Sequence, residues 1–220
     1  MEPQEYKRRL RADDKDDHDQ DRGNPAVDFR GEKRGNATHR STSDPDCRFV
    51  SKGSSGTGAY PGYTVNALME NRHRLLLGVG VEVFRSSASE EAGCVTLLQK
   101  AKKRLGFQPQ SLGADKGYFH RGFIEELFRR EISPHIASLP KGSSKAHMRV
   151  RMRQRGEPYR LSQRSRKKIE ELFGEAKDLH GLRRFRRRGL QRVRQETWLI
   201  GLVLNLKRLA KLTTPASVQA

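Results

Sequence analysis

The chain has 220 residues, and its net charge of +19 and isoelectric point near 10.5 indicate a polyanionic partner. Its two cysteines, Cys47 and Cys94, exclude a disulfide scaffold, and the absence of a long apolar span or signal-peptide core argues against membrane insertion or secretion. We therefore expect a cytoplasmic protein that does not associate with membranes.

The positive charge is concentrated in the last third of the chain. Residues 1–46 carry 10 Lys and Arg against 12 Asp and Glu, whereas residues 141–211 carry 22 against 6. We expect the surface that binds nucleic acid to be built mainly from residues 141–211.

The N-terminal residues 1–46 are polar and lack a hydrophobic period, so we expect them to be largely disordered or irregular. The acidic run from Asp13 to Asp21 has no apolar neighbours to hold ligands in place, and we interpret it as a solvated tract and not as a metal cluster. Residues 51–58 are predicted to be a flexible loop, and residues 213–220 a flexible tail. The folded domain is expected to span residues 47–212.

Within residues 47–212, the pattern of apolar residues predicts alternating strands and helices. Strands at 63–69 and 75–84 form a hairpin, and a helix from Ser89, its expected N-cap, to about 105 follows. The next elements are a strand at 111–115, a helix at 121–130, a strand at 134–137, a basic insertion at 140–160, a helix containing 164–177 and a last helix at about 192–212. This order predicts an α/β fold with one mixed sheet and flanking helices.

Two acidic residues are distinguished by their positions. Asp115 ends a predicted strand, and ligands bind at the carboxyl ends of strands in α/β sheets. Glu170 lies on a helical face with Arg166 one turn before it and Lys177 two turns after it. A carboxylate among phosphate-seeking cations suits a metal-dependent nucleic-acid enzyme, but an ordinary amphipathic helix with surface ion pairs has the same spacing.

An arginine block follows this helix. Arg183, Arg184, Arg186, Arg187, Arg188, Arg192 and Arg194 lie within twelve residues. We expect them to neutralise DNA phosphates, with Lys177 as a weaker contact, although solvated charges around a turn at Gly189 are the simpler alternative. Within the block, Phe185 either stacks on a base or, as we favour, anchors the block to the core.

The chain resembles bacterial insertion-sequence transposases of the DDE class, whose catalytic core is ribonuclease H-like. The resemblance rests on ALMENRHRLLLGVGVE, LGADKGYF, RKKIEELFGEAK, GLRRFRRRGLQRV and NLKRL, preceded by DFRGEKRGNATHRSTSDPDCR, together spanning residues 28–209. It implies that Asp115 and Glu170 are the second and third catalytic acids and ligands of Mg²⁺ or Mn²⁺, with Glu171 as an alternative in register. It also implies DNA partners, namely transposon ends and target, and allows a homo-oligomer.

The chain departs from this family at its first strand, which carries the first acid. Residues 1–27 contain no strand-like apolar run, so we expect an N-terminally truncated, catalytically incomplete transposase. The alternative function is a non-catalytic, basic nucleic-acid-binding fragment.

Overall fold

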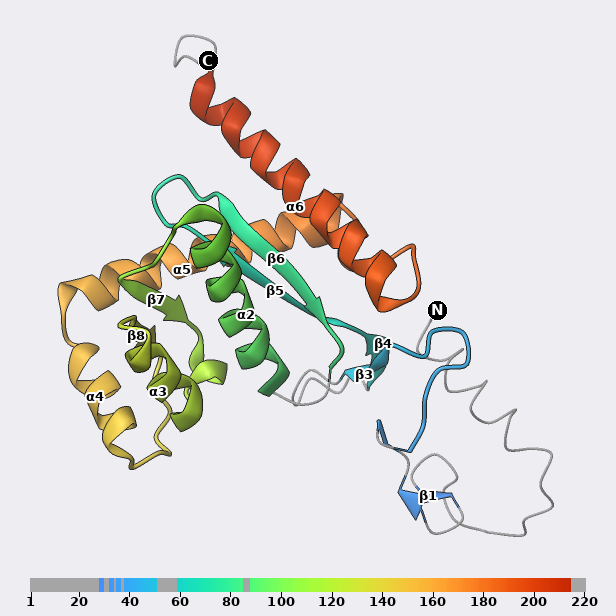
Figure 1. The fold of residues 1–220 in the computed structure, drawn as a ribbon, viewed down its shortest axis with the longest axis horizontal. Coiled ribbons are helices and arrows are strands. Elements are labelled where there is room, and N and C mark those ends of the chain that lie inside the picture. The colour runs from blue at the N-terminus through green and yellow to red at the C-terminus, as the bar shows by residue number, and fades with distance from the viewer. Residues whose placement is uncertain are drawn as a thin grey trace.

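Alternating residues build the central hairpin, strands β5 (Thr64–Met69) and β6 (Leu76–Glu82), in the computed structural model (Figure 1). Along β5, Thr64, Asn66 and Leu68 are buried, while the residues between them face the other side. This period of two confirms the predicted hairpin and gives the sheet two faces that helices can cover.

The structure describes residues 28–29, 32–33, 35–36, 38–50, 59–84 and 88–214, which form a mixed α/β fold. Its helices are α2 (Ala88–Leu105), α3 (Arg121–Arg129), α4 (Lys145–Arg153), α5 (Glu157–Leu179) and α6 (Leu190–Thr213), with a 3₁₀ turn at Lys116–Tyr118. The short strands are β1 (Asp28–Phe29), β2 (Glu32–Lys33), β3 (Arg48–Val50), β4 (Tyr60–Gly62), β7 (Ser111–Ala114) and β8 (Ser133–Ile136). The predicted acidic tract at Asp13–Asp21, the loop at 51–58 and residues 215–220 of the tail lie outside the described residues.

Helices cover the two faces of the hairpin differently. Helix α2 packs on one face, where Leu97 lies against the glycines of β6; a Cβ on Gly78 would come within 3.2 Å of its Cδ2 atom. Helices α5 and α6 pack on the opposite face, and Asn205 of α6 exchanges two hydrogen bonds with the backbone of Leu76. Figure 1 shows the hairpin between these layers.

The larger strand pairs are not joined into one sheet by the residues that the structure describes. β5 pairs with β6 in antiparallel fashion and β7 with β8 in parallel, so β5 and β7 each keep one edge without a described partner strand. Both pairs nevertheless share one core, because Leu68 of β5, Leu97 of α2 and Leu112 of β7 belong to the same buried cluster. We expected a single mixed sheet, and the two pairs are held together by helices instead.

Helix α5 contacts both strand pairs. It lies against β7 at Gly113 through Ser162 and Arg166, and it reaches the groove above β5 with Ile169 and Phe173. The helix therefore bridges the two pairs, which are not hydrogen-bonded to each other.

Local signals explain the elements that sequence patterns missed. Helix α4 lies inside the predicted basic insertion: Ser144 caps it, and Ala146, His147 and Val150 are buried among exposed charges. Helix α5 begins earlier than predicted because Pro158 lies in its first turn, where a missing N–H costs nothing. Strand β4 was also missed. Helices α2, α3 and α6 and strands β7 and β8 confirm the predicted elements within a few residues.

The hairpin turn is held by the carboxylate of Glu70, which accepts hydrogen bonds from the backbone N–H groups of Arg72, His73 and Leu75 at 2.8, 2.7 and 3.0 Å. Burial alone would raise the pKa of Glu70, but these hydrogen bonds outweigh it and lower the pKa below its ordinary 4.5. The carboxylate thus stabilises the folded chain fully above pH 4.5, and this contribution disappears as the pH falls through the lower folded-state pKa.

We expect Glu70→Gln to lower the free energy of unfolding at pH 7 by about 1–2 kcal/mol and to flatten its loss on acidification. Urea unfolding between pH 7 and pH 3 measures both. Glu125→Gln, which removes only an exposed ion pair with Arg121, is the matched control and should change stability by under about 0.5 kcal/mol. Equal acid sensitivity in the two variants would contradict this assignment.

Candidate functional site

Asp115 directly follows β7, as the sequence predicted, and is exposed at the end of the strand. Its Oδ1 atom accepts a hydrogen bond of 2.7 Å from the N–H of Gly117, which caps the 3₁₀ turn. This bond fixes the direction of the side chain and engages one of its two oxygens. The other oxygen has no hydrogen-bond partner among the described residues.

Two further acids, which the sequence analysis did not select as site residues, lie near Asp115. Burial, followed by the charges of Asp115 and Glu91, raises the pKa of Glu90. Glu91 in turn contacts the imidazole of His120. Both lie in the first turn of α2, and nothing local in the sequence indicates that this turn lies near Asp115.

Glu170 lies on the exposed side of α5, in the same row as Arg166. Its Oε1 atom is 2.6 Å from Nη1 of Arg166, and the Arg166 side chain lies over β7, with its Cβ 3.7 Å from the position of a Cβ on Gly113. Arg166 and Glu170 therefore lie on one helical face, as predicted. Further along α5, the Nζ atom of Lys177 lies 5.9 Å from the centroid of the Phe173 ring.

Glu171 points in a different direction from Glu170. It pairs with Lys168 at 2.6 Å and approaches Arg74 of the hairpin turn at 3.8 Å. The hydrogen bond from Lys168 lowers the pKa of Glu171. Glu170 and Glu171 are the two candidates for the third acid. Glu170 is the one whose ion-pair partner, Arg166, packs on β7.

No group of three or more His, Cys, Asp or Glu side chains among the described residues is arranged to hold a metal ion. Asp115 and Glu170 each offer what a hard divalent cation prefers, an anionic oxygen on an exposed side chain. The donor type fits Mg²⁺ or Mn²⁺, and two carboxylates make only part of a binding site.

The backbone of the arginine block is held in place by acids from other parts of the chain. Glu196 accepts hydrogen bonds from the N–H groups of Arg186 and Arg187 at 3.1 and 3.2 Å, and Asp44 accepts one from Gly189 at 3.2 Å. Gly189 has a φ of +83°, a conformation that favours glycine. The turn is consequently built independently of the arginine side chains.

Phe185 fixes the same turn from the inside. Its ring meets that of Tyr63 edge to face, with centroids 6.3 Å apart, and the Tyr63 hydroxyl donates to Asp44 at 2.7 Å. Burial and that hydrogen bond raise the pKa of Tyr63. Phe185 is thus a packing residue, the role that the sequence analysis favoured.

The arginines of the block differ in what they contact. Arg183 pairs with Asp178 at 2.6 Å, whereas the side chains of Arg186, Arg187, Arg188 and Arg192 are exposed and form no ion pair with any residue that the structure describes. Arg184 is also exposed. Arg194 is committed to the fold, since its Nε donates to the carbonyl of Val81 at 3.0 Å and its Nη2 lies 3.3 Å from Glu82.

Of the two residues beside Asp115, Tyr118 is packed into the fold and Lys116 is exposed. The ring of Tyr118 packs on that of Phe123 at 5.3 Å, and burial raises the pKa of its hydroxyl. Lys116 is exposed next to Asp115. Packing therefore accounts for Tyr118, and Lys116 is the neighbour of Asp115 that faces solvent.

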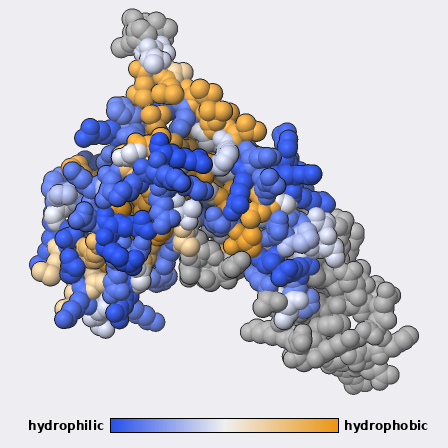
Figure 2. Space-filling model, in the orientation of Figure 1, coloured by the Kyte–Doolittle hydropathy of each residue, from blue (hydrophilic) through white to orange (hydrophobic). Residues whose placement is uncertain are grey.

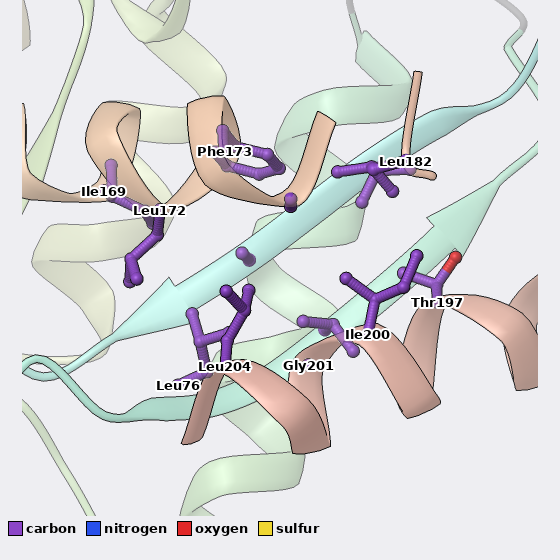
Figure 3. Close-up of a pocket in the computed structure, with 13 residues that line it drawn as sticks. Leu76, Ile169, Leu172, Phe173, Leu182, Thr197, Ile200, Gly201 and Leu204 are labelled. Carbon is purple, nitrogen blue, oxygen red and sulfur yellow. The ribbon is translucent and has the colours of Figure 1, made fainter. Parts of the chain in front are cut away.

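An apolar groove that is partly open to solvent lies between the hairpin and helices α5 and α6 (Figure 3). Figure 3 shows Leu76, Phe173 and Leu204 among the side chains that line it. The one hydroxyl in its lining, that of Thr197, donates to the carbonyl of Val193. Since no titratable side chain lines this groove, we interpret it as an apolar seam of the core.

Comparison with known families gave one match: the sequence model of the transposase DDE domain matches residues 27–206. Comparison with curated proteins and with solved structures gave no match. Among the helices that the structure describes, none combines the length and the apolar character needed to cross a bilayer.

Proposed function

Because the chain belongs to the transposase DDE domain family, we propose that it is a transposase that binds DNA through its arginine block and a divalent metal ion through Asp115 and Glu170. The observation that carries this proposal is the close packing of α5 on β7 at Gly113, which links the helix bearing Glu170 to the strand that ends at Asp115. The family typically consists of metal-dependent polynucleotidyl transferases.

The DNA-binding part of the proposal rests on charge and exposure. Arg186, Arg187 and Arg188 project from a turn whose backbone is held by Glu196, so they keep their charges available for phosphates. Arginine binds phosphate oxygens in bidentate fashion, and each neutralised phosphate releases counterions. Transposon ends and target DNA are the proposed partners.

The metal-binding part rests on the acids at the end of β7. Asp115 and Glu170 would supply anionic oxygens. The charges of Asp115 and Glu91 also act on Glu90, after burial, to raise its pKa, so carboxylates gather near the end of β7. A bound Mg²⁺ or Mn²⁺ would activate the oxygen that attacks a phosphodiester and stabilise the leaving oxygen. Arg166 engages Oε1 of Glu170, which leaves Oε2 for the ion.

We further propose that the chain is catalytically incomplete by itself. In the DDE class, to which the chain belongs, the first acid lies on the first strand of the core. Residues 1–27 lack the apolar run that such a strand requires. Two acids would then hold a metal ion without the bridging third ligand.

Manganese binding followed by electron paramagnetic resonance tests the metal site. We expect the purified protein to bind Mn²⁺, and Asp115→Asn or Glu170→Gln each to weaken this binding at least about tenfold, as the loss of a carboxylate ligand does. Glu171→Gln, a neighbouring acid on the same helix, is the matched control. If only Glu171→Gln weakened binding, the alternative register would hold; if no variant did, the metal site would be refuted.

DNA nicking in the presence of Mg²⁺ or Mn²⁺ tests completeness separately. We expect binding without nicking. Nicking that Asp115→Asn abolishes would refute incompleteness while supporting the transposase assignment. Absence of both nicking and metal binding would select the second candidate, a non-catalytic DNA-binding protein, which the Arg166–Glu170 ion pair of 2.6 Å favours because it gives Glu170 an ordinary surface role.

A further inference from the structure

The side-chain amide of Gln163, on α5, connects this helix to the ends of both strands of the parallel pair. Its Nε2 atom donates to the carbonyl oxygen of His135 in β8 and lies 3.5 Å from the carbonyl oxygen of Ala114 in β7. Ala114 is the residue directly before Asp115. The amide therefore ties α5 to the stretch of backbone from which Asp115 projects.

The other end of the same amide holds Arg166. Nε of Arg166 donates to Oε1 of Gln163 at 3.1 Å, and Nη1 of Arg166 donates to Oε1 of Glu170 at 2.6 Å. The spacing of three and then four residues puts these side chains on one row of the helix. A continuous chain of hydrogen bonds thus runs from the two strand ends through Gln163 and Arg166 to Glu170.

The neighbours of Gln163 also determine which way its amide points. Carbonyl oxygens lie on one side of the amide, and the N–H of Arg166 lies on the other. Turning the amide by half a rotation would set Oε1 against carbonyl oxygens and Nε2 against an N–H group, so both contacts would become repulsive. The position therefore requires a side chain that donates at one end and accepts at the other, which an apolar residue does not provide.

Glu170 depends on this chain because its own surroundings do not fix it. Its side chain is 61% exposed, whereas that of Arg166 is 21% exposed. The face of the molecule in Figure 2 is largely hydrophilic, and on such a surface an exposed carboxylate is solvated and has many cations to pair with. An isolated exposed ion pair fixes little, since both side chains stay free to move. Arg166 differs, because Gln163 holds it over β7 at Gly113 independently of Glu170.

We propose that Gln163 is a positioning residue, which holds Arg166 and, through it, Glu170 at a fixed place relative to the end of β7. The inference rests on the metal site proposed above, in which Asp115 and Glu170 bind a divalent ion from two different elements. Gln163 would contact neither the ion nor DNA. It would limit the freedom that Glu170 has to lose when it binds the ion, and so raise the affinity of the site.

Mn²⁺ binding followed by electron paramagnetic resonance should be about tenfold weaker in Gln163→Met, which keeps the length and helix propensity of glutamine but removes both hydrogen bonds. In a Glu170→Gln background the same change should cause no further loss, because Gln163 acts only through Glu170. Arg166→Lys keeps the charge but lacks the forked guanidinium that joins Gln163 to Glu170, so it should weaken binding to a similar degree. A further tenfold loss in the double variant would overturn the proposal.

Gln154→Met is the matched control. The Gln154 amide also bonds a carbonyl of β8, that of Ile136 at 2.8 Å, and it accepts from the Ser138 hydroxyl at 3.1 Å; its described side-chain bonds lead to neither Arg166 nor Glu170. Both glutamine variants should lower the midpoint of urea unfolding to a similar extent, but only Gln163→Met should weaken Mn²⁺ binding. Equal weakening in the two variants would reduce Gln163 to a structural role and overturn the proposal.

A measurement without metal separates this inference from the metal site. The Nε–Hε signal of Arg166 in proton–nitrogen correlation spectra, identified by its loss in Arg166→Lys, should exchange with water faster in Gln163→Met and not in Gln154→Met. An unchanged signal in Gln163→Met would overturn the proposal, as would Mn²⁺ binding that Glu170→Gln weakens and Gln163→Met does not. Release of Arg166 together with Mn²⁺ binding that Glu170→Gln leaves unchanged would support the positioning chain and refute the proposed metal site.

Discussion

Replacing Arg186, Arg187 and Arg188 together by glutamine is expected to weaken DNA binding roughly 100-fold near physiological salt and to reduce the slope of log affinity against log salt by about 2 to 3. The expectation follows from three exposed guanidinium groups that pair with no acid among the described residues. The fold should survive, because Glu196 holds this turn through the backbone N–H groups of Arg186 and Arg187. Fluorescence anisotropy with a labelled duplex, titrated at several salt concentrations, gives both quantities.

The matched control removes the same charge elsewhere. Lys102, Lys103 and Arg104 form the exposed last turn of α2, the helix on the opposite face of the hairpin from α6. Their replacement by glutamine should lower affinity only slightly. Equal losses of affinity and slope in the two triple variants would show that net charge, and not the arginine block, attracts DNA.

The second large effect is expected from Gly113→Val, which adds a side chain where α5 lies against β7. Even a Cβ at this position would lie 2.8 Å from the Ser162 hydroxyl and 3.3 Å from its carbonyl oxygen, so the Ser162 side chain has to rotate and the helix has to shift by a few tenths of an ångström. Overpacking of this kind costs about 1–3 kcal/mol of unfolding free energy. Since α5 carries Glu170, the same shift should weaken Mn²⁺ binding at least about tenfold in protein that remains folded, if our proposed site is correct.

Gly122→Val makes the same chemical change in α3, where a Cβ would meet no atom within 4 Å. It should leave metal binding unchanged and stability within about 0.5 kcal/mol, since valine is no worse than glycine in a helix. Urea unfolding and Mn²⁺ titration of both variants decide the matter. A Gly113→Val variant that is destabilised but binds Mn²⁺ normally would separate the packing contact from the proposed site.

Sequence patterns predicted most of the elements because each depends on residues near in the chain. The period of two in residues 64–69 and the apolar stripe of α2 are local properties, and so are the stop at Gly106, with a φ of +62°, and the strand end at Asp115. Helix α4 escaped notice because its buried residues are few and its charges many. Asp115 and Glu170 could be named from motifs, and their catalytic roles stay predictions.

By itself, the sequence determined the family, the basic character of the last third and the order of strands and helices, since motifs, charge and periodicity are all properties of neighbouring residues. Only the tertiary structure decided which arginine side chains are available, because the guanidinium of Arg194 is bound by β6 while that of Arg186 forms no ion pair with a described acid. It also decided that the charge of Asp115 acts on Glu90 and that β5 and β7 belong to separate strand pairs. These are contacts between distant segments, and they depend on how helices pack across strands, which no local pattern records.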